Sequence, residues 1–462
     1  MNTSLLRLAA TSAIAAACLS ACGGGGGGGA TATAGQTVAA PTTTPTTTPT
    51  APTTTPITPT TTPTTPTTTP TSPTTPTNDP TTPVTDPGTP VTNPSTPVTN
   101  PGTPTVLFGT AAVSIAGDAG CGYDSVNLTV TKLRFHMDAN ATDSSTGWTE
   151  LPLSQPKRIN TAQLRNGATM ALGTAALLPG HYAQARLVID SNSSGGTTNS
   201  VVASGTSAEL PLITQSAAPG GVLFNESFDI ANGQALNLVV NVDSCRSIVP
   251  NNDQVLLRPV LTPVPVVKNG ISGFVATSLL GSNVLVTLQQ NGVVLRSTLA
   301  DAVTGEFNLA RMPLGKYDVV ISADNAAAAV ISGVTVGATS GFVALNSALD
   351  PIVLDASSTG TINASLSLEP VSAVEAPFGS ALQSFENGPL VTVRARMSNL
   401  ANGKVRFTML PLARPILANW QSGQPLTWNR GVAITPGLGI YTIAASAPGY
   451  VTTKTLPFTA TN

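Results

Sequence analysis

The sequence predicts an all-β protein with two or three consecutive antiparallel β-sandwich domains behind a disordered tether. Apolar and polar residues alternate over many short stretches after residue 105, which is the pattern of half-buried strands. Valine, glycine and Asn-Gly turns are abundant in the same region, as is typical of β-sheets. Roughly 350 residues follow position 105, which is enough for two or three domains.

Residues 1–21 are interpreted as a lipoprotein signal peptide. Arg7 precedes the apolar run 8–19, which is shorter than the roughly 20 residues that span a bilayer, and small residues follow. The segment Leu19-Ser20-Ala21-Cys22 resembles the bacterial lipobox. The resemblance implies that Cys22 takes a thioether-linked diacylglycerol and palmitate-like acyl chains. The alternative is an ordinary signal peptide that is cut near Ala21 and leaves Cys22 free.

The residue after Cys22 indicates the membrane in which the lipid is held. Lipoproteins that this leader resembles often carry an acidic residue there when they stay at the inner membrane, whereas this chain has Gly23. We therefore expect an outer-membrane protein whose domains face the periplasm or the cell surface. Because each buried methylene contributes about 0.8 kcal/mol, several acyl chains make a firm anchor.

Residues 22–105 form the predicted tether, a glycine run followed by a tract of proline and threonine. Such a segment has almost no apolar side chains to bury, so it cannot offset the entropy lost on folding. Proline favours extended polyproline II, and at roughly 3.1 Å per residue the Pro/Thr tract reaches on the order of 200 Å. Its hydroxyls are acceptors for O-linked sugars, and an unmodified spacer is the alternative.

Composition excludes some partners and leaves one pair of cysteines. Only 9% of the residues are charged, the net charge is −2 and no basic patch occurs, so nucleic acid is not an expected partner. With Cys22 lipidated, Cys121 and Cys245 remain for the mature protein. An even pair in an oxidising compartment predicts a disulfide. A metal site is the alternative, but the chain has only two histidines.

The first predicted domain covers residues 106–267. Its period-two runs include 126–130, after which the phase slips by one residue toward Leu133 and Phe135. A slip of this kind predicts a β-bulge or a bend. Asn232-Gly233 predicts a turn before another alternating run, and residues 160–172 are predicted as a short helix.

Several segments of the first domain resemble an uncharacterised family of bacterial envelope lipoproteins, a domain of unknown function. The resemblance covers about 160 residues, implies a secreted β-sandwich and implies no activity. It is carried by Tyr123-Asp124-Ser125-Val126-Asn127-Leu128-Thr129-Val130-Thr131, Gly147-Trp148, Leu178-Pro179-Gly180-His181-Tyr182, Arg186-Leu187-Val188-Ile189-Asp190, Asp243, Arg246-Ser247-Ile248-Val249 and Leu257-Arg258-Pro259-Val260.

The second and third predicted domains cover residues 268–355 and 356–462. The second resembles the carboxypeptidase regulatory-like domain, a small transthyretin-like or Ig-like sandwich grouped with carbohydrate-binding-like folds. The third is similar but diverged. The resemblance is carried by Ile271-Ser272-Gly273-Phe274-Val275, Gly305-Glu306-Phe307-Asn308-Leu309, Pro313-Leu314-Gly315-Lys316-Tyr317-Asp318-Val319-Val320, Gly439-Ile440-Tyr441-Thr442-Ile443 and Pro448-Gly449-Tyr450.

A glycine stands two residues before a tyrosine once in each predicted domain. The tyrosines are Tyr182, Tyr317 and Tyr441. We expect the glycine to adopt a positive φ at a turn, and the tyrosine to bury its ring while its hydroxyl bonds nearby backbone, as in a tyrosine corner. A ligand-stacking role is the alternative.

The sequence contains no constellation that predicts an enzyme. No serine lies in a Gly-x-Ser-x-Gly elbow, His136 is expected on the polar face of its strand, and His181 is expected in a turn without a nucleophile. Four aspartates of the first domain are candidate calcium ligands, but their spacing matches no calcium-loop pattern, and turn capping is the expected role. They are Asp118, Asp124, Asp190 and Asp243. No catalytic residue, metal or cofactor is predicted.

The sequence predicts a non-catalytic, lipid-anchored protein of the envelope or cell surface, whose folded domains are held away from the membrane to bind a partner. Besides the membrane, its expected partner is a polysaccharide or another envelope protein. The alternative is an array of carbohydrate-binding modules, because Trp420 and Trp428 lie in a Gln- and Pro-rich stretch that suits an aromatic platform. Packing in the core is the other reading of the two tryptophans, and packing is also expected of Trp148.

Overall fold

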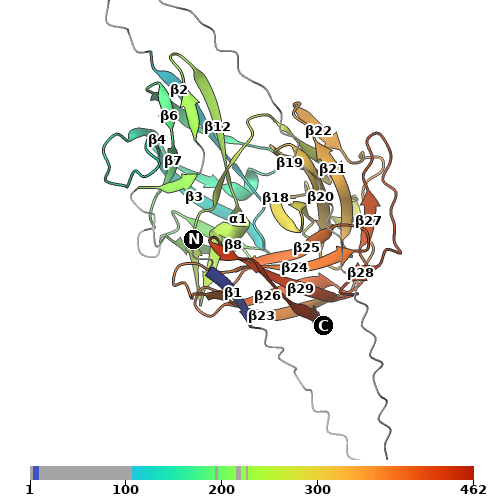
Figure 1. Cartoon of the computed structure of the whole chain (residues 1–462). Helices are drawn as coiled ribbons and strands as arrows, with labels where there is room; N and C mark the ends of the chain where they lie inside the picture. The colour runs from blue at the N-terminus through green and yellow to red at the C-terminus, as the bar shows by residue number, and fades with distance from the viewer. Residues whose placement is uncertain (1–3, 10–106, 193–195, 215–219, 225–226, 462) are drawn as a thin grey trace, which may run out of the picture. The chain divides into compact units, whose positions relative to one another are not determined.

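A computed structural model describes residues 4–9, 107–192, 196–214, 220–224 and 227–461. Cys22, most of the predicted leader and the predicted tether lie outside these residues. The described elements are strands apart from the short helix α1 (Ser244–Ser247) and two turns of 3₁₀-helix, η1 (Thr161–Gln163) and η2 (Thr277–Leu279). The predicted all-β class is therefore confirmed (Figure 1). Among the described residues, no helix is long and apolar enough to cross a bilayer.

The first unit contains two large sheets and a small one. In chain order its strands are β2 (Gly109–Gly117), β3 (Tyr123–His136), β4 (Thr149–Asn160), β5 (Met170–Leu177), β6 (Gly180–Tyr182), β7 (Gln184–Ile189), β8 (Ser200–Ala203), β9 (Glu209–Ile213), β10 (Val222–Phe224), β11 (Phe228–Ile230), β12 (Ala235–Val242), β13 (Ile248–Asn251), β14 (Gln254–Leu257) and β15 (Leu261–Val264).

The core of the first unit lies between its two large sheets. One sheet has the order β15-β12-β2-β5, and the other has the order β10-β7-β3-β8-β9-β14-β13 with β4 paired to β3. Buried side chains of β2 and β12, such as Ile115 and Val240, join the same apolar cluster as Leu128 and Phe135 of β3. The alternating runs read from the sequence are thus the inward faces of a β-sandwich.

The predicted bulge lies in β3. Against β7 the register of β3 shifts between Val130 and Lys132, so Thr131 is the extra residue, and the register against β4 shifts at the same place. The shift moves the apolar phase by one, which keeps Leu133 and Phe135 in the core with Leu128 and Val130.

The predicted helix over residues 160–172 does not form. Only η1 is helical, with Asn160 capping the amide of Ala162, and a strand begins at Met170. Asn166 and Gly167 have φ values of 59° and 78°, which end a helix. The Asn166 side chain accepts bonds from the second unit, so tertiary contacts stabilise this turn.

The second unit is a two-sheet sandwich that borrows a strand from beyond residue 355. The sheets have the orders β19-β16-β22 and β18-β17-β20-β21-β27, and β27 (Ile416–Asn419) pairs in parallel with β21. The other strands are β16 (Asn269–Phe274), β17 (Leu285–Gln290), β18 (Val293–Leu299), β19 (Glu306–Ala310), β20 (Gly315–Ser322), β21 (Ala329–Val336) and β22 (Gly341–Ala344).

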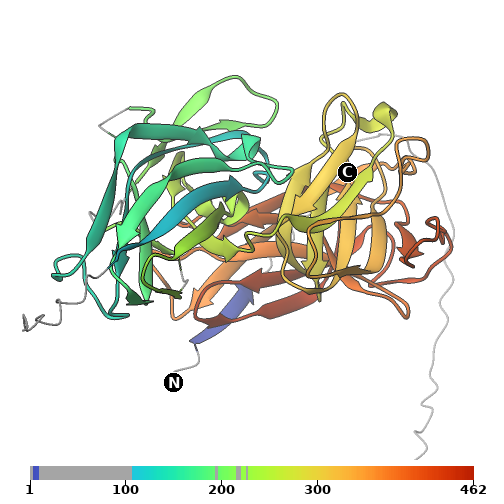
Figure 2. The same ribbon diagram turned by 90° about the horizontal axis from the view of Figure 1, so that it is seen from above.

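The third unit also has two sheets, drawn in Figure 2 in orange to red except for the blue strand β1 (Ser4–Ala9). The first sheet has the order β26-β23-β1-β30, and the second has the order β25-β24-β29-β31 with β28 paired to β24. The strands are β23 (Thr359–Glu369), β24 (Phe378–Phe385), β25 (Leu390–Met397), β26 (Lys404–Pro411), β28 (Ile434–Thr435), β29 (Ile440–Ser446), β30 (Tyr450–Val451), β31 (Thr453–Thr459) and β1 (Ser4–Ala9).

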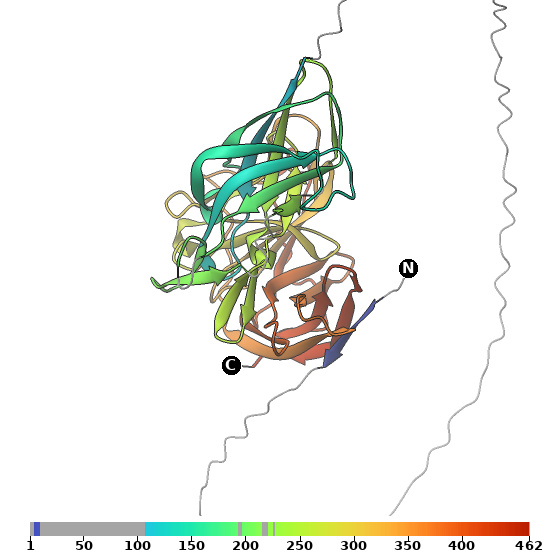
Figure 3. The same cartoon turned by 90° about the vertical axis from the view of Figure 1, so that its left-hand side faces the viewer.

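Strand β1 comes from the segment predicted as the leader. It pairs antiparallel with residues 365–369 of β23 and parallel with β30, and Figure 3 shows it in blue beside the third unit. Strand β26 pairs with residues 359–365 of β23, and β1 pairs with residues 365–369 on the other side.

The three tyrosines that follow a glycine are buried and bonded to backbone, as predicted. The hydroxyls of Tyr182 and Tyr317 donate to carbonyls four residues upstream, at 3.1 and 2.8 Å, and that of Tyr441 donates to the carbonyl of Pro411 at 2.6 Å. The expectation of a positive φ holds for two of the glycines and is wrong for Gly315. At Gly315 a Cβ would lie 3.3 Å from the Tyr317 ring, so the close approach of that ring favours glycine at this position.

Candidate functional site

The predicted disulfide lies at the boundary of the three units. Cys121 and Cys245 are bonded, with a sequence separation of 124 and a Cα–Cα distance of 4.9 Å. Cys121 precedes β3, and Cys245 lies on α1, whose N-terminus is capped by Asp243 through the Arg246 amide at 3.0 Å. Asp243 therefore caps a turn of helix, as expected.

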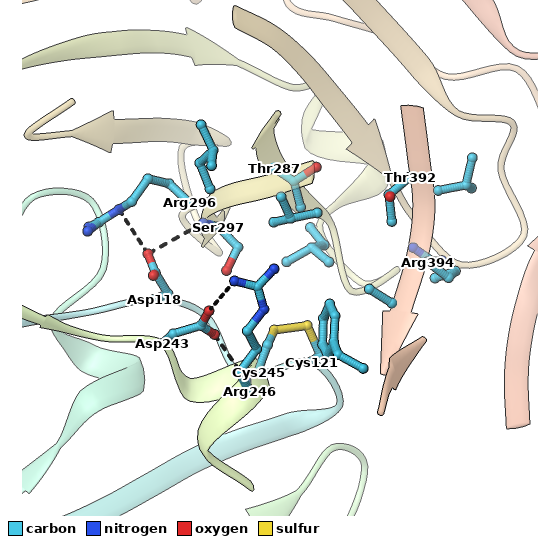
Figure 4. A pocket seen from close by; sticks show the side chains of 16 residues that line it. Asp118, Cys121, Asp243, Cys245, Arg246, Thr287, Arg296, Ser297, Thr392 and Arg394 are labelled. Atoms are coloured by element: carbon cyan, nitrogen blue, oxygen red, sulfur yellow. Dashed lines mark hydrogen bonds and ion pairs between the residues drawn. A yellow bond between two sulfur atoms is a disulfide. The ribbon is translucent and has the colours of Figure 1, made fainter. Parts of the chain in front are cut away.

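A buried ion pair next to the disulfide joins the first unit to the second. Arg296 Nε lies 3.1 Å from Asp118 Oδ1, and the Ser297 amide donates to the same oxygen at 3.4 Å (Figure 4). Asn241 donates to Asp118 Oδ2 at 2.6 Å. Burial raises the pKa of Asp118 to about 6, although Arg296 opposes that shift.

The cavity beside this ion pair is too small for an organic ligand. Its volume is about 30 Å³, which is room for about one water molecule. Figure 4 shows the Asp118–Arg296 pair, the Asp243–Arg246 pair and the disulfide around it. We therefore assign a structural role to this polar junction.

A groove of about 800 Å³ lies on the other side of Arg246. Its floor is the outer face of the sheet β25-β24-β29-β31, because the lining residues Phe378, Ser380 and Leu382 alternate with the inward core residue Ala381. Ser380 pairs with Ala444, and Ala444 pairs with Lys454, so these three lie in one row across the sheet. All three line the groove.

The walls of the groove come from the first and second units. The first unit contributes Val222, Leu223 and the segment 258–261, and the second contributes the tip of the β17–β18 hairpin. A volume of this size, lined mainly by apolar side chains with a few charges, is the usual form of a small-molecule site. We take this groove as the candidate functional site.

Three of the four charged residues that line the groove are cations. Arg258 pairs with Glu375 at 2.7 Å, which joins the first unit to the third. Arg246 has its guanidinium 4.9 Å from the centre of the Phe378 ring and 3.7 Å from Asp243. Lys454 is exposed and has no ion pair among the described residues. The groove is therefore mildly electropositive.

The sequence did not reveal this groove. The one local signal is that Phe378 and Leu382 are apolar on a strand whose other face is already in the core. A sheet face that meets water is normally polar, so two apolar faces indicate that something covers the second one. Which residues form the walls depends on contacts among segments that are far apart in the chain.

His136 lies beside Arg134 on the polar face of β3, opposite the core residues Leu133 and Phe135, as predicted, and it is buried there. Its Nε2 lies 2.8 Å from the carbonyl oxygen of Thr146, and its Nδ1 accepts from the Asp138 amide at 2.9 Å. Its ring lies 4.9 Å from Trp148, which explains the burial. With both ring nitrogens bonded to backbone, His136 is built into the fold.

Trp148 packs as expected, but its partners are charged. The guanidinium groups of Arg134 and Arg186 lie 4.3 and 4.7 Å from the centre of the indole ring. Arg186 also pairs with Asp143, and Arg134 pairs with Glu150 at 2.9 Å. These contacts hold the loop that carries Trp148 onto strands β3 and β7.

The other candidate ligand residues, His181, Asp124 and Asp190, do not lie together in one site. His181 Nδ1 lies 2.9 Å from Asp229 in an exposed pair. Asp124 accepts from the Ser204 hydroxyl at 2.6 Å, and Asp190 accepts from the amide of the next residue at 2.9 Å. Among the described residues, no group of three or more His, Cys, Asp or Glu is placed to hold a metal ion.

Trp420 and Trp428 are half-buried, and both pack on the apolar core of the second unit. The reason is β27, which carries the chain from the third unit onto the edge of β21 just before Trp420. The Trp420 amide donates to the Ser332 carbonyl at 2.9 Å. The two tryptophans belong to the second sandwich in space, although they lie in the third segment of the sequence.

Residues 108–259 match the family model described as "Domain of unknown function (DUF4382)". The match covers most of the first unit, including both disulfide cysteines, Asp118 and Arg246. It supports the predicted similarity of this segment to an uncharacterised domain family. The comparison with curated proteins gives no match to the chain.

Proposed function

We propose that this chain is a non-catalytic, lipid-anchored envelope protein that binds a small apolar ligand in the groove. The observation that carries the proposal is the groove itself, which has about 800 Å³ of volume and walls from all three units. A site assembled from three units is held open by the contacts between them. Those contacts include the Arg258–Glu375 and Asp118–Arg296 ion pairs.

The anchor in this proposal is the acylated Cys22, and the localisation is the outer membrane. The Cys121–Cys245 disulfide supports an oxidising compartment. Residues 22–105 then hold the binding unit away from the bilayer. In this proposal β1 leaves with the leader, so that the mature chain presents the backbone of residues 365–369 at an open sheet edge.

Two measurements on the intact chain and on Cys22→Ser test the anchor and the groove. The intact chain is expected to incorporate labelled palmitate and fractionate with membranes, whereas Cys22→Ser takes no label and becomes soluble. The soluble Cys22→Ser chain is then titrated with Nile red, an uncharged dye that fluoresces in apolar sites. We expect saturable binding, because the floor and walls of the groove are mostly apolar.

A matched pair of variants tests whether the dye binds in the groove. Ser380→Trp puts an indole on the groove floor and is expected to abolish dye binding. Ser384→Trp lies four residues along the same strand, outside the groove lining, and should leave binding unchanged. Equal dye binding by both variants would overturn the groove as the site, and palmitate label on Cys22→Ser would overturn the anchor.

Carbohydrate binding is the second candidate. It is supported by the resemblance of residues 268–355 to carbohydrate-binding-like sandwiches, and by the part of Trp420 and Trp428 that stays accessible to solvent. Much of each ring is used in packing on the second unit's core, so less remains for stacking on a sugar. A glycan-binding screen of the chain tests this candidate. Glycan binding that is lost in Trp420→Ala or Trp428→Ala would support it, and absence of binding to any glycan would exclude it.

A further inference from the structure

The groove combines an apolar floor with a cation at its outer strand. Along one row of the sheet, Ser380, Ala444 and Lys454 follow one another from β24 to β31. Neighbouring strands lie about 4.8 Å apart, so Lys454 stands about 10 Å from the Ser380 position. A chain of methylenes can lie across that distance on the floor with one end at the lysine.

The charges around the groove favour an anion at Lys454. Glu375 is occupied by Arg258 at 2.7 Å. The carboxylate of Asp243 caps α1 and also faces Arg246. Lys454 is the groove cation without an ion pair among the described residues, and its flexible stem allows the ammonium to meet a ligand at the rim.

We infer that the ligand of the groove is a single-chain acyl anion, of which a fatty acid is the simplest example. This inference rests on the proposed function and adds the chemical class of the ligand. The acyl chain lies between Leu382, Val293 and the apolar wall of the first unit, and the anionic head lies at Lys454. Burial of apolar methylenes gives most of the affinity, and the lysine selects the anion.

The test compares two ligands of equal chain length that differ in charge. The soluble Cys22→Ser chain is titrated by calorimetry with laurate, below its micelle concentration, and with dodecanol. We expect laurate to bind one per chain and about three- to tenfold more tightly than dodecanol. Raising the salt concentration should weaken laurate binding and leave dodecanol binding unchanged, because salt screens only the charged contact.

A lysine variant with a matched control assigns the head-group contact. Lys454→Gln keeps a polar side chain of similar length, and it is expected to lower the affinity for laurate to that for dodecanol. Lys404→Gln changes an exposed lysine of the same unit outside the groove lining, and it should change neither affinity. Ser380→Trp should abolish binding of both ligands.

The possible failures separate the two proposals. Equal binding of laurate and dodecanol, with no effect of Lys454→Gln, would overturn the anion and leave a groove for neutral apolar ligands. Nile red binding without binding of either acyl ligand would overturn the acyl class but not the binding function. Absence of all three would overturn the proposed binding function as well.

Discussion

Asp118 is a buried carboxylate whose partners come from two units. It accepts from Asn241 of its own unit and meets Arg296 and Ser297 of the second. Removing it from water favours its neutral form, and this effect exceeds the attraction of Arg296, so its pKa rises from 3.8 to about 6. The charge on Asp118 therefore changes over a pH range near 6, and the stability of the fold changes with it.

The first prediction concerns the pH dependence of folding. Because the pKa of Asp118 is higher in the folded chain than in the unfolded chain, its contribution to stability is full below about pH 4 and is lost as the pH rises through about 6. The loss amounts to about 3 kcal/mol. Urea unfolding at a series of pH values from 4 to 7 measures it.

Asp118→Asn provides the comparison for that measurement. Asparagine cannot titrate, so the variant should lack this part of the pH dependence while other groups continue to contribute theirs. The informative quantity is the difference in slope between wild type and variant, not the absolute stability of either. Parallel pH profiles for the two chains would show that Asp118 does not titrate in this way.

The three buried tyrosines show that a sequence pattern can be enough to predict how a single residue packs. The glycine-tyrosine spacing predicted three buried rings with bonded hydroxyls, because ring size and a polar tip leave few other solutions. The spacing did not show why glycine is needed at each of these positions. Gly439 has a φ of 61°, whereas Gly315 leaves room for the Tyr317 ring.

At the scale of elements, strands were easier to predict than the one expected helix. The bulge in β3 appears in the sequence as a slip of the period-two pattern, because every residue of a strand changes face when the register shifts by one. The segment 160–172 has helix-forming residues, but its Asn-Gly turn is held by bonds from Thr298 and Asn308. Those bonds cross between units and leave no local signal.

The second prediction concerns the disulfide that ties α1 to the segment before β3. The bond closes a loop of 124 residues, which in the chain-entropy model stabilises the fold by about 5 kcal/mol. The double variant Cys121→Ser, Cys245→Ser is expected to unfold at a clearly lower urea concentration. Wild type with reductant should approach the variant, and identical midpoints for all three samples would contradict the prediction.

At the scale of the whole molecule, buried hydrogen bonds join the three units to one another. The Gln289 side chain of the second unit both donates to the Thr392 carbonyl, at 2.7 Å, and accepts from its amide, at 2.8 Å. Buried polar groups need such partners, so these bonds fix the second unit against the third. The Leu400 amide likewise donates to the Pro250 carbonyl at 2.8 Å, which joins the third unit to the first.

The third prediction is that residues 268–355 do not fold alone. Without β27, the edge of β21 and the core beneath Trp420 and Trp428 are exposed. We expect this fragment to aggregate or to show no cooperative thermal transition by circular dichroism. The fragment 268–462 retains β27 and should unfold cooperatively, and a stable, cooperative 268–355 fragment would show that the borrowed strand is dispensable.

The sequence by itself determined the all-β class, the bulge in β3, the buried tyrosines and the pairing of Cys121 with Cys245. These features depend on period-two patterns, side-chain size and the parity of the cysteines, which are local or compositional. Only the tertiary structure decided where β27 pairs, how Asp118 meets Arg296 and that a groove exists. The groove arises where an apolar outer sheet face is incompletely covered by two other units, and no stretch of sequence encodes the space between them.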